Sequence, residues 1–180
     1  KMKNRRKLVI ALGAGALVSS ITSFAQPQGK VWRVGFLSPR SRPVSFDSNF
    51  LGAFPRGMRD LGYVEGKNLV IEWRFADGQY ERLPGLAAEL VQMKVDVIVT
   101  AATPGARAAQ QATATIPIVF TTVADPIEFG LVKSLARPEG NLTGLANLAG
   151  DVSLKHLEML LSMVPKLSRV AVMVNPANQS

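Results

Sequence analysis

The sequence predicts an α/β fold in which a doubly wound parallel sheet carries helices on its faces. Short runs rich in Val and Ile alternate with segments of helical periodicity, which is the pattern of βαβ units. Six strands are expected, at residues 32–38, 68–76, 95–101, 116–122, 142–147 and 169–174. Because crossovers between parallel strands are right-handed, the expected strand order is 2-1-3-4-5.

The first predicted helix lies between the first two strands. Apolar side chains recur there at helical spacing, at Phe50, Phe54, Met58 and Leu61. Gly62 follows at the position where glycine commonly ends a helix. Pro55 removes one backbone hydrogen bond and crowds the preceding turn, so the helix either begins near Phe54 or is kinked.

Four more helices are expected between the later strands. The second has its apolar face at Leu83, Leu86, Ala87, Leu90 and Val91. The third opens with Thr103 as a cap and Pro104 at the first helical position. Asp125 and Pro126 repeat that pattern before a fourth helix with apolar residues at Ile127, Leu131, Val132 and Leu135. The last carries a leucine stripe at Leu154, Leu157, Leu160 and Leu161, and the single histidine, His156, is expected on its surface.

Residues 1–25 have the three parts of an export signal. Five Lys and Arg side chains precede an apolar run at residues 8–18, and Ser23 and Ala25 are the small residues that a signal peptidase reads. Cleavage is therefore expected before Gln26. A membrane anchor is the alternative, but a spanning helix needs about 20 apolar residues, and hydroxyl side chains interrupt the run from residue 19 onward.

The composition limits the possible partners and chemistry. Removing the signal lowers Lys+Arg from 21 to 16 against 13 Asp+Glu, and the remaining cations are scattered singly, so nucleic acid is not an expected partner. The chain has no cysteine and one histidine, which argues against disulfides, a lipid-modified N-terminal cysteine, a thiolate nucleophile, a histidine triad or a multi-histidine metal site. No cofactor and no metal are expected.

The expected ligand site lies beyond the carboxyl ends of the strands, where the strand order reverses. Thr103, Pro104 and Gly105 follow the third strand, and the helix that starts there presents free backbone N–H groups suited to a carboxylate. Thr103 either adds its hydroxyl to this anion site or only caps the helix, and the sequence leaves both open.

The loops after the first and fourth strands supply the other candidates. Thr121, Thr122 and Asp125 bring two hydroxyls and one carboxylate to the same edge. Asp125 is expected to pair with a ligand amine or to cap the following helix, and both roles are compatible if each oxygen takes a different donor. Ser38, at the end of the first strand, is a weaker candidate. Arg40 and Arg42 are available for a second acidic group on a ligand.

Several blocks, taken in order, resemble one protein family: residues 61–68 (LGYVEGKN), 116–120 (IPIVF), 125–126 (DP), 130–132 (GLV) and 140–144 (GNLTG). They are similar to the tryptophan/tyrosine-type substrate-binding proteins of ABC transporters, and the similarity runs from Val31 to Pro176. Arg5 and Arg6 also resemble a twin-arginine signal; a general secretory signal is the alternative.

The resemblance implies a type I periplasmic-binding-protein-like fold, in which two α/β lobes close on a small solute and deliver it to a membrane permease. The first lobe is expected at residues 26–148, with the crossover helix and first strand of an incomplete second lobe at residues 149–180. An amino acid or similar small polar or aromatic solute, a monomeric state and a periplasmic location are implied. The blocks at 103–104 and 121–126 fall in the family's ligand-facing loops.

Two other functions are alternatives to solute binding for an importer. In the first, the same lobe is an exported sensory module that presents a ligand to a membrane receptor. An enzyme on a flavodoxin-like fold is the least favoured, because the sequence has no cysteine, no histidine cluster and no genuine phosphate-binding loop.

Overall fold

The computed structural model describes residues 29–47, 49–147, 150–164, 166–171 and 173, without the side chains of 150–154. The chain divides into two units, Lys1–Lys30 and Val31–Ser180. The predicted export signal lies outside the described residues. Every element named below belongs to the second unit.

The second unit is built on one parallel sheet. Its elements are β1 (Trp32–Ser38), η1 (Phe50–Gly52), α2 (Ala53–Asp60), β2 (Leu69–Phe75), η2 (Tyr80–Arg82), α3 (Leu83–Gln92), β3 (Val97–Ala101), α4 (Ala102–Ala112), β4 (Ile118–Ala124), β5 (Leu142–Asn147) and α5 (Gly150–Met163). All pairs of neighbouring strands are parallel, and the order is β2-β1-β3-β4-β5. The predicted fold class and strand order are therefore confirmed.

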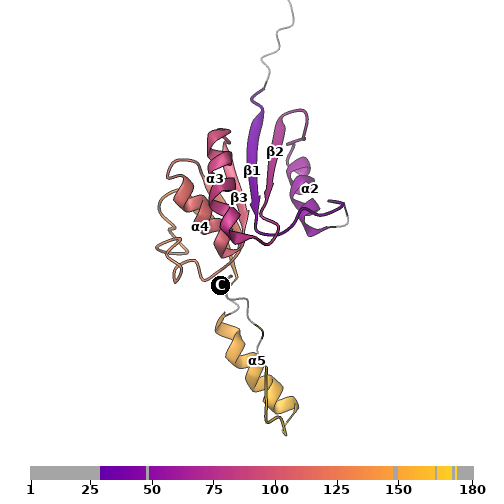
Figure 1. Ribbon diagram of the computed structural model, residues 1–180, viewed down its shortest axis with the longest axis vertical. Helices are drawn as coiled ribbons and strands as arrows, with labels where there is room; N and C mark the ends of the chain where they lie inside the picture. The colour runs from indigo at the N-terminus through magenta and orange to yellow at the C-terminus, as the bar shows by residue number, and fades with distance from the viewer. Residues whose placement is uncertain (1–28, 48, 148–149, 165, 172, 174–180) are drawn as a thin grey trace, which may run out of the picture. The chain divides into compact units, whose positions relative to one another are not determined.

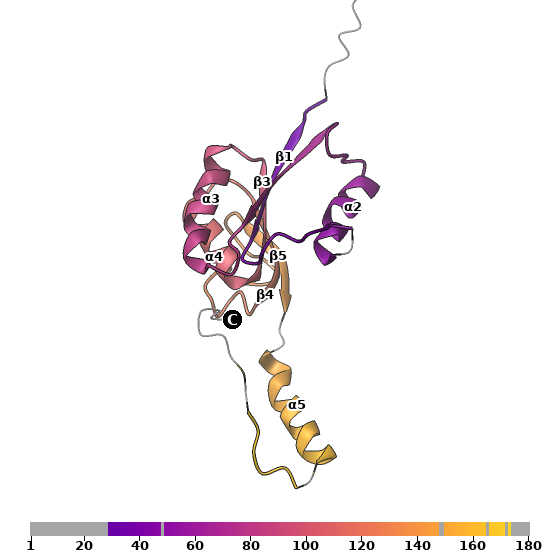
Figure 2. The same cartoon turned by 45° about the vertical axis from the view of Figure 1, so that its right-hand side comes forward.

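Helices cover both faces of this sheet, with α3 and α4 on one face and α2 on the other (Figures 1 and 2). The α3/α4 side is filled by a core that includes Leu37, Leu90 and Ile98, none of them exposed. The side chains of β1 and β2 that point the other way form a second core with Leu51 and residues of α2. Burial on both faces explains why the strands read as nearly continuous apolar runs.

An aromatic cluster dominates the α2 side. The Trp73 ring lies 4.6 Å from the ring centroids of both Phe36 and Phe46, and it meets Phe54 of α2 edge to face at 6.4 Å. Pro55 is the third residue of α2, in the first turn, where its missing N–H removes no intrahelical bond. The helix therefore begins near Phe54, the first of the two predicted alternatives.

The residues at which several strands begin or end are set by hydrogen bonds that the runs of apolar residues do not reveal. β1 and β5 have the predicted bounds, and β2 is one residue shorter at each end. β4 begins two residues later than predicted because Pro117 has no N–H and the N–H of Ile116 donates to Thr113 Oγ1 at 3.1 Å. β3 also begins later, because the N–H of Val95 donates back to Leu90 in α3.

The predicted helix after Asp125 and Pro126 does not form. The N–H groups of Leu131 and Val132 both donate to the carbonyl of Pro126, at 2.8 and 3.1 Å, and Gly130 is left-handed with φ +65°. This closure turns the chain away before a second helical turn can start. The helix prediction was wrong here, and Asp125 closes a turn instead, with its Oδ1 accepting from the N–H groups of Ile127 and Glu128.

The last predicted strand, 169–174, is also absent from the part of it that the structure describes, residues 169–171 and 173. Strands persist through hydrogen bonds to a neighbour, and none of the described strands pairs with this segment. The predicted leucine stripe does lie on a helix, α5, where Leu157, Leu160 and Leu161 are exposed. His156 is exposed, as predicted.

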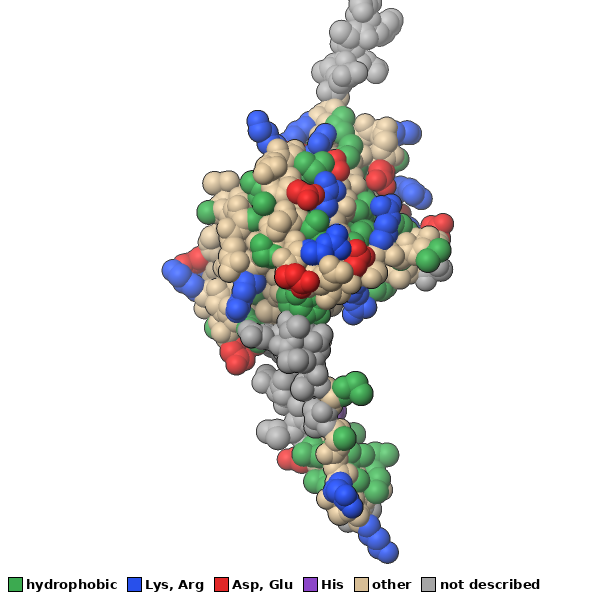
Figure 3. Space-filling view, in the orientation of Figure 1, with side chains coloured by type: hydrophobic (Ala, Val, Ile, Leu, Met, Phe, Trp, Pro, Cys, Tyr) green, Lys and Arg blue, Asp and Glu red, His purple; other side chains and the backbone are tan. Residues whose placement is uncertain are grey.

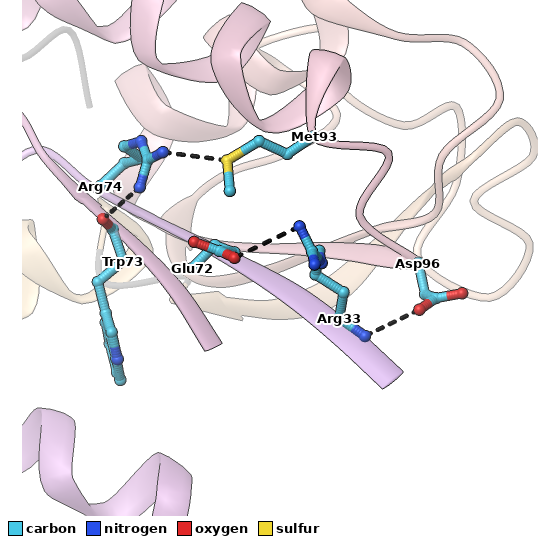
Figure 4. A network of polar contacts seen from close by, with 6 residues as sticks. All are labelled: Arg33, Glu72, Trp73, Arg74, Met93 and Asp96. Atoms are coloured by element: carbon cyan, nitrogen blue, oxygen red, sulfur yellow. Dashed lines mark hydrogen bonds and ion pairs between the residues drawn. The ribbon is translucent and has the colours of Figure 1, made fainter. Parts of the chain in front are cut away.

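Charged side chains cover the α3 side of the edge strand β2. Glu72 pairs with Arg33 of β1 at 3.6 Å, and Arg74 pairs with Glu89 of α3 at 2.7 Å. Arg74 also contacts the sulfur of Met93, and Asp96 accepts from the backbone of Arg33 (Figure 4). Acidic and basic side chains are interleaved across the face seen in Figure 3, and such charges discourage pairing of an edge strand with another chain.

No described helix combines the length and apolar character needed to cross a membrane.

Candidate functional site

The candidate site is the edge of the sheet where the strands end. Ser38 ends β1, Ala101 ends β3 and Ala124 ends β4, and parallel pairing brings these ends to one side. Ala101 is directly paired with Thr121. The residues predicted after the first, third and fourth strands therefore lie along one edge, with different degrees of exposure.

Ser38 is buried at this edge, with 1% of its surface exposed. Its Oγ accepts from the N–H of Arg40 at 3.2 Å, and its carbonyl accepts from Ala76 at 2.9 Å. A further backbone bond joins the loops after β1 and β2, from Gly78 to Pro39 at 2.9 Å. Ser38 therefore organises two loops rather than presenting an open hydroxyl.

Arg40 and Arg42 lie in the loop after β1. The Arg40 guanidinium lies 5.3 Å from the ring centre of Phe50, and that of Arg42 lies 5.9 Å from the ring centre of Phe46. Each arginine thus has an aromatic partner within cation–π range. This gives both residues a role that does not require an acidic ligand.

The junction of β3 and α4 departs from the predicted cap. The helix starts at Ala102, two residues earlier than predicted, and its N-cap is Ala101, which makes no side-chain hydrogen bond. Thr103 is the second helical residue and Pro104 the third. The interpretation of Thr103 as a cap was therefore wrong, because Ala102 takes a left-handed conformation, φ +62°, that turns the strand directly into the helix.

Replacing Ala102 by glycine is expected to stabilise the protein by up to about 1 kcal/mol. Left-handed φ costs an L-residue about 1–2 kcal/mol, and the larger backbone entropy of glycine offsets part of the gain. Urea unfolding monitored by circular dichroism measures the change, with Ala102→Val, expected to destabilise, as the opposing variant. A destabilised Ala102→Gly would contradict a strained junction.

Among the described residues, no side chain accepts a hydrogen bond from the first N–H groups of α4. No acidic residue lies in its first turn, and the N–H groups of Ala102 and Thr103 precede the first intrahelical bonds. The positive end of the helix dipole adds to their attraction for an anion. This backbone feature is the part of the predicted anion site that the geometry favours most.

Gly105 has a packing role in this helix. It is buried, and an added Cβ would lie 2.3 Å from Thr100 Oγ1 and 3.9 Å from the carbonyl oxygen of Leu37. The missing side chain therefore lets α4 approach the end of β3. Gly105 was predicted to let a ligand approach the backbone, whereas the structure puts a strand on that side.

A β-bulge shapes the end of β4. The pairing of β4 with β5 shifts between Phe120 and Val123, and Thr122 within it is left-handed, with φ +54°. Thr122 is exposed, whereas Thr121 is half-buried and its Oγ1 donates to the Thr100 carbonyl at 3.3 Å. Bulges re-aim side chains at the edges of functional sites, and this one presents the Thr122 hydroxyl.

Asp125 uses only one of its two carboxylate oxygens within the described structure. Oδ1 accepts from the N–H groups of Ile127 and Glu128, each at 3.0 Å. No hydrogen bond or ion pair to Oδ2 occurs among the described residues. The two predicted roles of Asp125 are therefore geometrically compatible, with Oδ1 fixing the turn and Oδ2 available to a ligand.

A pocket of about 200 Å³ lies beside this edge, between the start of α3 and one side of α4. Its lining residues are Tyr80, Leu83, Pro84, Thr103, Pro104, Arg107, Ala108 and Gln111. Thr103 and Pro104 were predicted, and the others were not. Arg107 stands four residues after Thr103, on the same side of the helix, which is the sequence signal that points to it.

Within the described residues, no group of three or more Asp, Glu or His side chains is arranged to hold a metal ion.

The chain is similar to proteins of known family. The sequence model of the family described as "ABC transporter substrate binding protein" matches residues 43–180. A tyrosine-binding protein of Clostridioides difficile is 38% identical over 123 residues, which are 68% of this chain and 35% of that protein.

Two solved structures are also similar. A conserved domain protein from Vibrio cholerae has 36% sequence identity and a TM-score of 0.72, over 83% of this chain and 49% of that one. The ABC domain in complex with L-Trp from Streptococcus pneumonia has 30% identity and a TM-score of 0.56, over 64% of this chain and 38% of that one. The chain thus spans half or less of the length of these relatives.

The doubly wound sheet, with an uncapped helix and a bulged strand at its carboxyl edge, defines an α/β domain of the ligand-binding class. The family match makes this specific. The chain belongs to the ABC transporter substrate binding protein family, whose members are substrate-binding proteins rather than enzymes.

Proposed function

We propose that this chain forms the first lobe, residues 26–148, and the start of the second lobe, residues 149–180, of an exported protein that binds an aromatic amino acid for an ABC importer. The tyrosine-binding relative and the L-Trp complex support this solute class. The predicted signal at residues 1–25 supports delivery to the periplasm by a twin-arginine-like or general secretory route. The partner would be a permease in the inner membrane, and the complete protein would act as a monomer.

The observation that carries the proposal is the pairing of opposite polarities at one sheet edge. The uncapped amino end of α4 suits the solute carboxylate. Asp125, which follows the adjacent strand, has Oδ2 available for the solute ammonium. Ala101, directly before α4, is paired with Thr121, and Asp125 follows four residues later, just beyond β4, so both groups belong to this end of the sheet. Thr122 adds an exposed hydroxyl beside them.

Asp125→Asn is expected to weaken binding of L-tyrosine or L-tryptophan about tenfold or more. The amide oxygen of asparagine still accepts from Ile127 and Glu128, so the turn is kept, while the charge that pairs with the ligand ammonium is lost. Isothermal titration calorimetry measures the affinity, and urea unfolding verifies that stability is nearly unchanged.

Glu128→Gln is the matched control, because Glu128 is an exposed acid in the same turn. It is expected to bind as the parent chain does. Equal affinity of the parent and Asp125→Asn proteins would exclude Asp125 as the ammonium partner. Failure of the parent chain to bind any aromatic amino acid would overturn the proposal for this chain.

A further inference from the structure

Phe50 is an exposed aromatic side chain in the loop that follows β1. It is 61% exposed, and the other exposed Phe, Tyr or Trp among the described residues is Trp32, at the start of β1 and therefore at the opposite end of the strands. The aromatic cluster around Trp73 packs ring against ring. No such ring contact joins Phe50 to another described aromatic residue, so core packing does not explain its position.

The chain beside Phe50 is held firmly. Asn49 Oδ1 accepts from the N–H of Leu51 at 3.0 Å, and the Asn49 carbonyl accepts from the N–H of Gly52 at 3.0 Å. Leu51 and Gly52 are buried, and a Cβ on Gly52 would collide with the carbonyl oxygen of Phe46. A fixed turn therefore presents the Phe50 ring to solvent, and a ligand that covers the ring would have little backbone ordering to offset.

Arg40 contacts this ring and fixes its place at the carboxyl edge of the sheet. The N–H of Arg40 donates to Ser38 Oγ at 3.2 Å, and the Arg40 carbonyl accepts from the N–H of Asp77 at 3.3 Å. These bonds tie the backbone of Arg40 to the ends of β1 and β2. The guanidinium carbon of Arg40 lies 5.3 Å from the centre of the Phe50 ring, so the ring lies just beyond the end of β1.

The end of β1 is next to the groups proposed to bind the charged ends of the solute. Leu37 of β1 pairs with Thr100 of β3, so the strand that leads into α4 neighbours the strand that leads to Arg40 and Phe50. The strand that leads to Asp125, β4, lies on the other side of β3. The edge therefore offers an aromatic ring, a helix amino end and a carboxylate, in the order of β1, β3 and β4.

We propose that Phe50, supported by Arg40, is the surface on which the aromatic ring of the solute stacks. The inference rests on the amino-acid site proposed above and assigns its preference for aromatic over aliphatic side chains. Two aromatic rings in an offset or edge-to-face arrangement attract each other beyond the effect of the area they bury, whereas an aliphatic side chain gains from burial alone. Phe50 therefore favours tryptophan and tyrosine over leucine.

The test compares the affinities of the 180-residue chain and its variants for L-tryptophan and L-leucine by isothermal titration calorimetry. Phe50→Ala is expected to weaken L-tryptophan binding about tenfold and L-leucine binding about twofold. Phe50→Leu keeps an apolar side chain without a ring and is expected to lose most of the preference for tryptophan, whereas Phe50→Tyr is expected to keep it. Since the position is exposed, the fold is expected to persist in all three variants.

Arg40→Gln is expected to weaken L-tryptophan binding about threefold, because the Phe50 ring loses the cation that contacts it. Arg59→Gln is the matched control, because it removes the same charge from an exposed position on α2. Trp32→Ala is the control for the ring, because it removes an exposed aromatic side chain at the opposite end of β1. Both controls are expected to bind L-tryptophan as the parent does.

Asp125→Asn separates this inference from the proposed function. It is expected to weaken both ligands alike, because both carry an ammonium group, whereas Phe50→Ala changes the ratio of the two affinities. Weaker binding in Asp125→Asn with an unchanged ratio in Phe50→Ala would leave the amino-acid site standing and overturn the stacking surface. Parental L-tryptophan affinity in Phe50→Leu would overturn it as well. Absence of L-tryptophan binding by the parent chain would overturn both proposals.

Discussion

Gly105→Ala is expected to lower the free energy of unfolding by about 3 kcal/mol, at the upper end of the cost of overpacking a core. The added Cβ would lie 2.3 Å from Thr100 Oγ1, a separation at which one group must move. Thr100 is fully buried and lies within β3, and its branched side chain has few alternative rotamers. Urea unfolding followed by circular dichroism gives the change.

Thr100→Ala in the same chain is expected to restore most of that stability. Thr100 Cβ lies 3.7 Å from the position of the added carbon, which is an ordinary contact, so only the hydroxyl obstructs it. That hydroxyl has no hydrogen-bond partner in the described structure, and its loss by itself is expected to cost little. The double-mutant cycle should therefore give a large favourable coupling energy.

Gly57→Ala is the matched control. Gly57 lies in α2, where an added Cβ meets nothing within 4 Å, and alanine is the better helix former by about 1 kcal/mol. This variant is expected to be more stable than the parent. If Gly105→Ala did not lower the free energy of unfolding, or if Thr100→Ala did not restore the lost stability, the close approach of α4 to β3 would not be the reason for glycine at position 105.

The strand order could be predicted because it depends on features that the sequence displays. Buried parallel strands are apolar on both faces, and the handedness of crossovers leaves few topologies. The exact strand and helix limits depend instead on single hydrogen bonds between distant residues. The bond that ties Ile116 to Thr113 and the double bond to the Pro126 carbonyl are of this kind, and periodicity carries no signal for them.

The location of the candidate site followed from topology, since residues after adjacent parallel strands must meet at one edge. The roles within it were harder to predict. Thr103 resembles a cap in sequence, and only the left-handed backbone of Ala102 moves the helix start and buries the hydroxyl. Alanine is not a residue in which that conformation is expected, so the sequence favours the ordinary interpretation.

The pocket was missed for a different reason. Tyr80 and Arg107 are 27 positions apart, and they come together only because α3 and α4 pack side by side on one face of the sheet. Each residue by itself resembles an ordinary surface or boundary side chain. Sites assembled from two helices require the tertiary arrangement, whereas a site built from strand ends is implied by the order of the strands.

Trp73→Ala is expected to lower the free energy of unfolding by about 3 kcal/mol, the lower end of the cost of removing a large aromatic side chain from a core, because Trp73 is half-buried. Trp73 lies between the sheet and α2 and meets Phe36, Phe46 and Phe54 through ring contacts at 4.6, 4.6 and 6.4 Å. It also stacks on Phe75, 5.9 Å away. Its removal leaves this cluster without its central ring, and urea unfolding measures the loss.

Two further variants test the cause of that loss. Trp73→Phe keeps part of the ring surface and is expected to cost clearly less than the alanine change. Phe50→Ala removes an aromatic ring that is 61% exposed and is expected to cost less than about 1 kcal/mol. The α2 side and the α3/α4 side have separate cores, so near-ultraviolet circular dichroism should show loss of aromatic packing in Trp73→Ala before the sheet unfolds. Similar losses for Trp73→Ala and Phe50→Ala would mean that the central position of Trp73 in the cluster does not decide how firmly α2 is held.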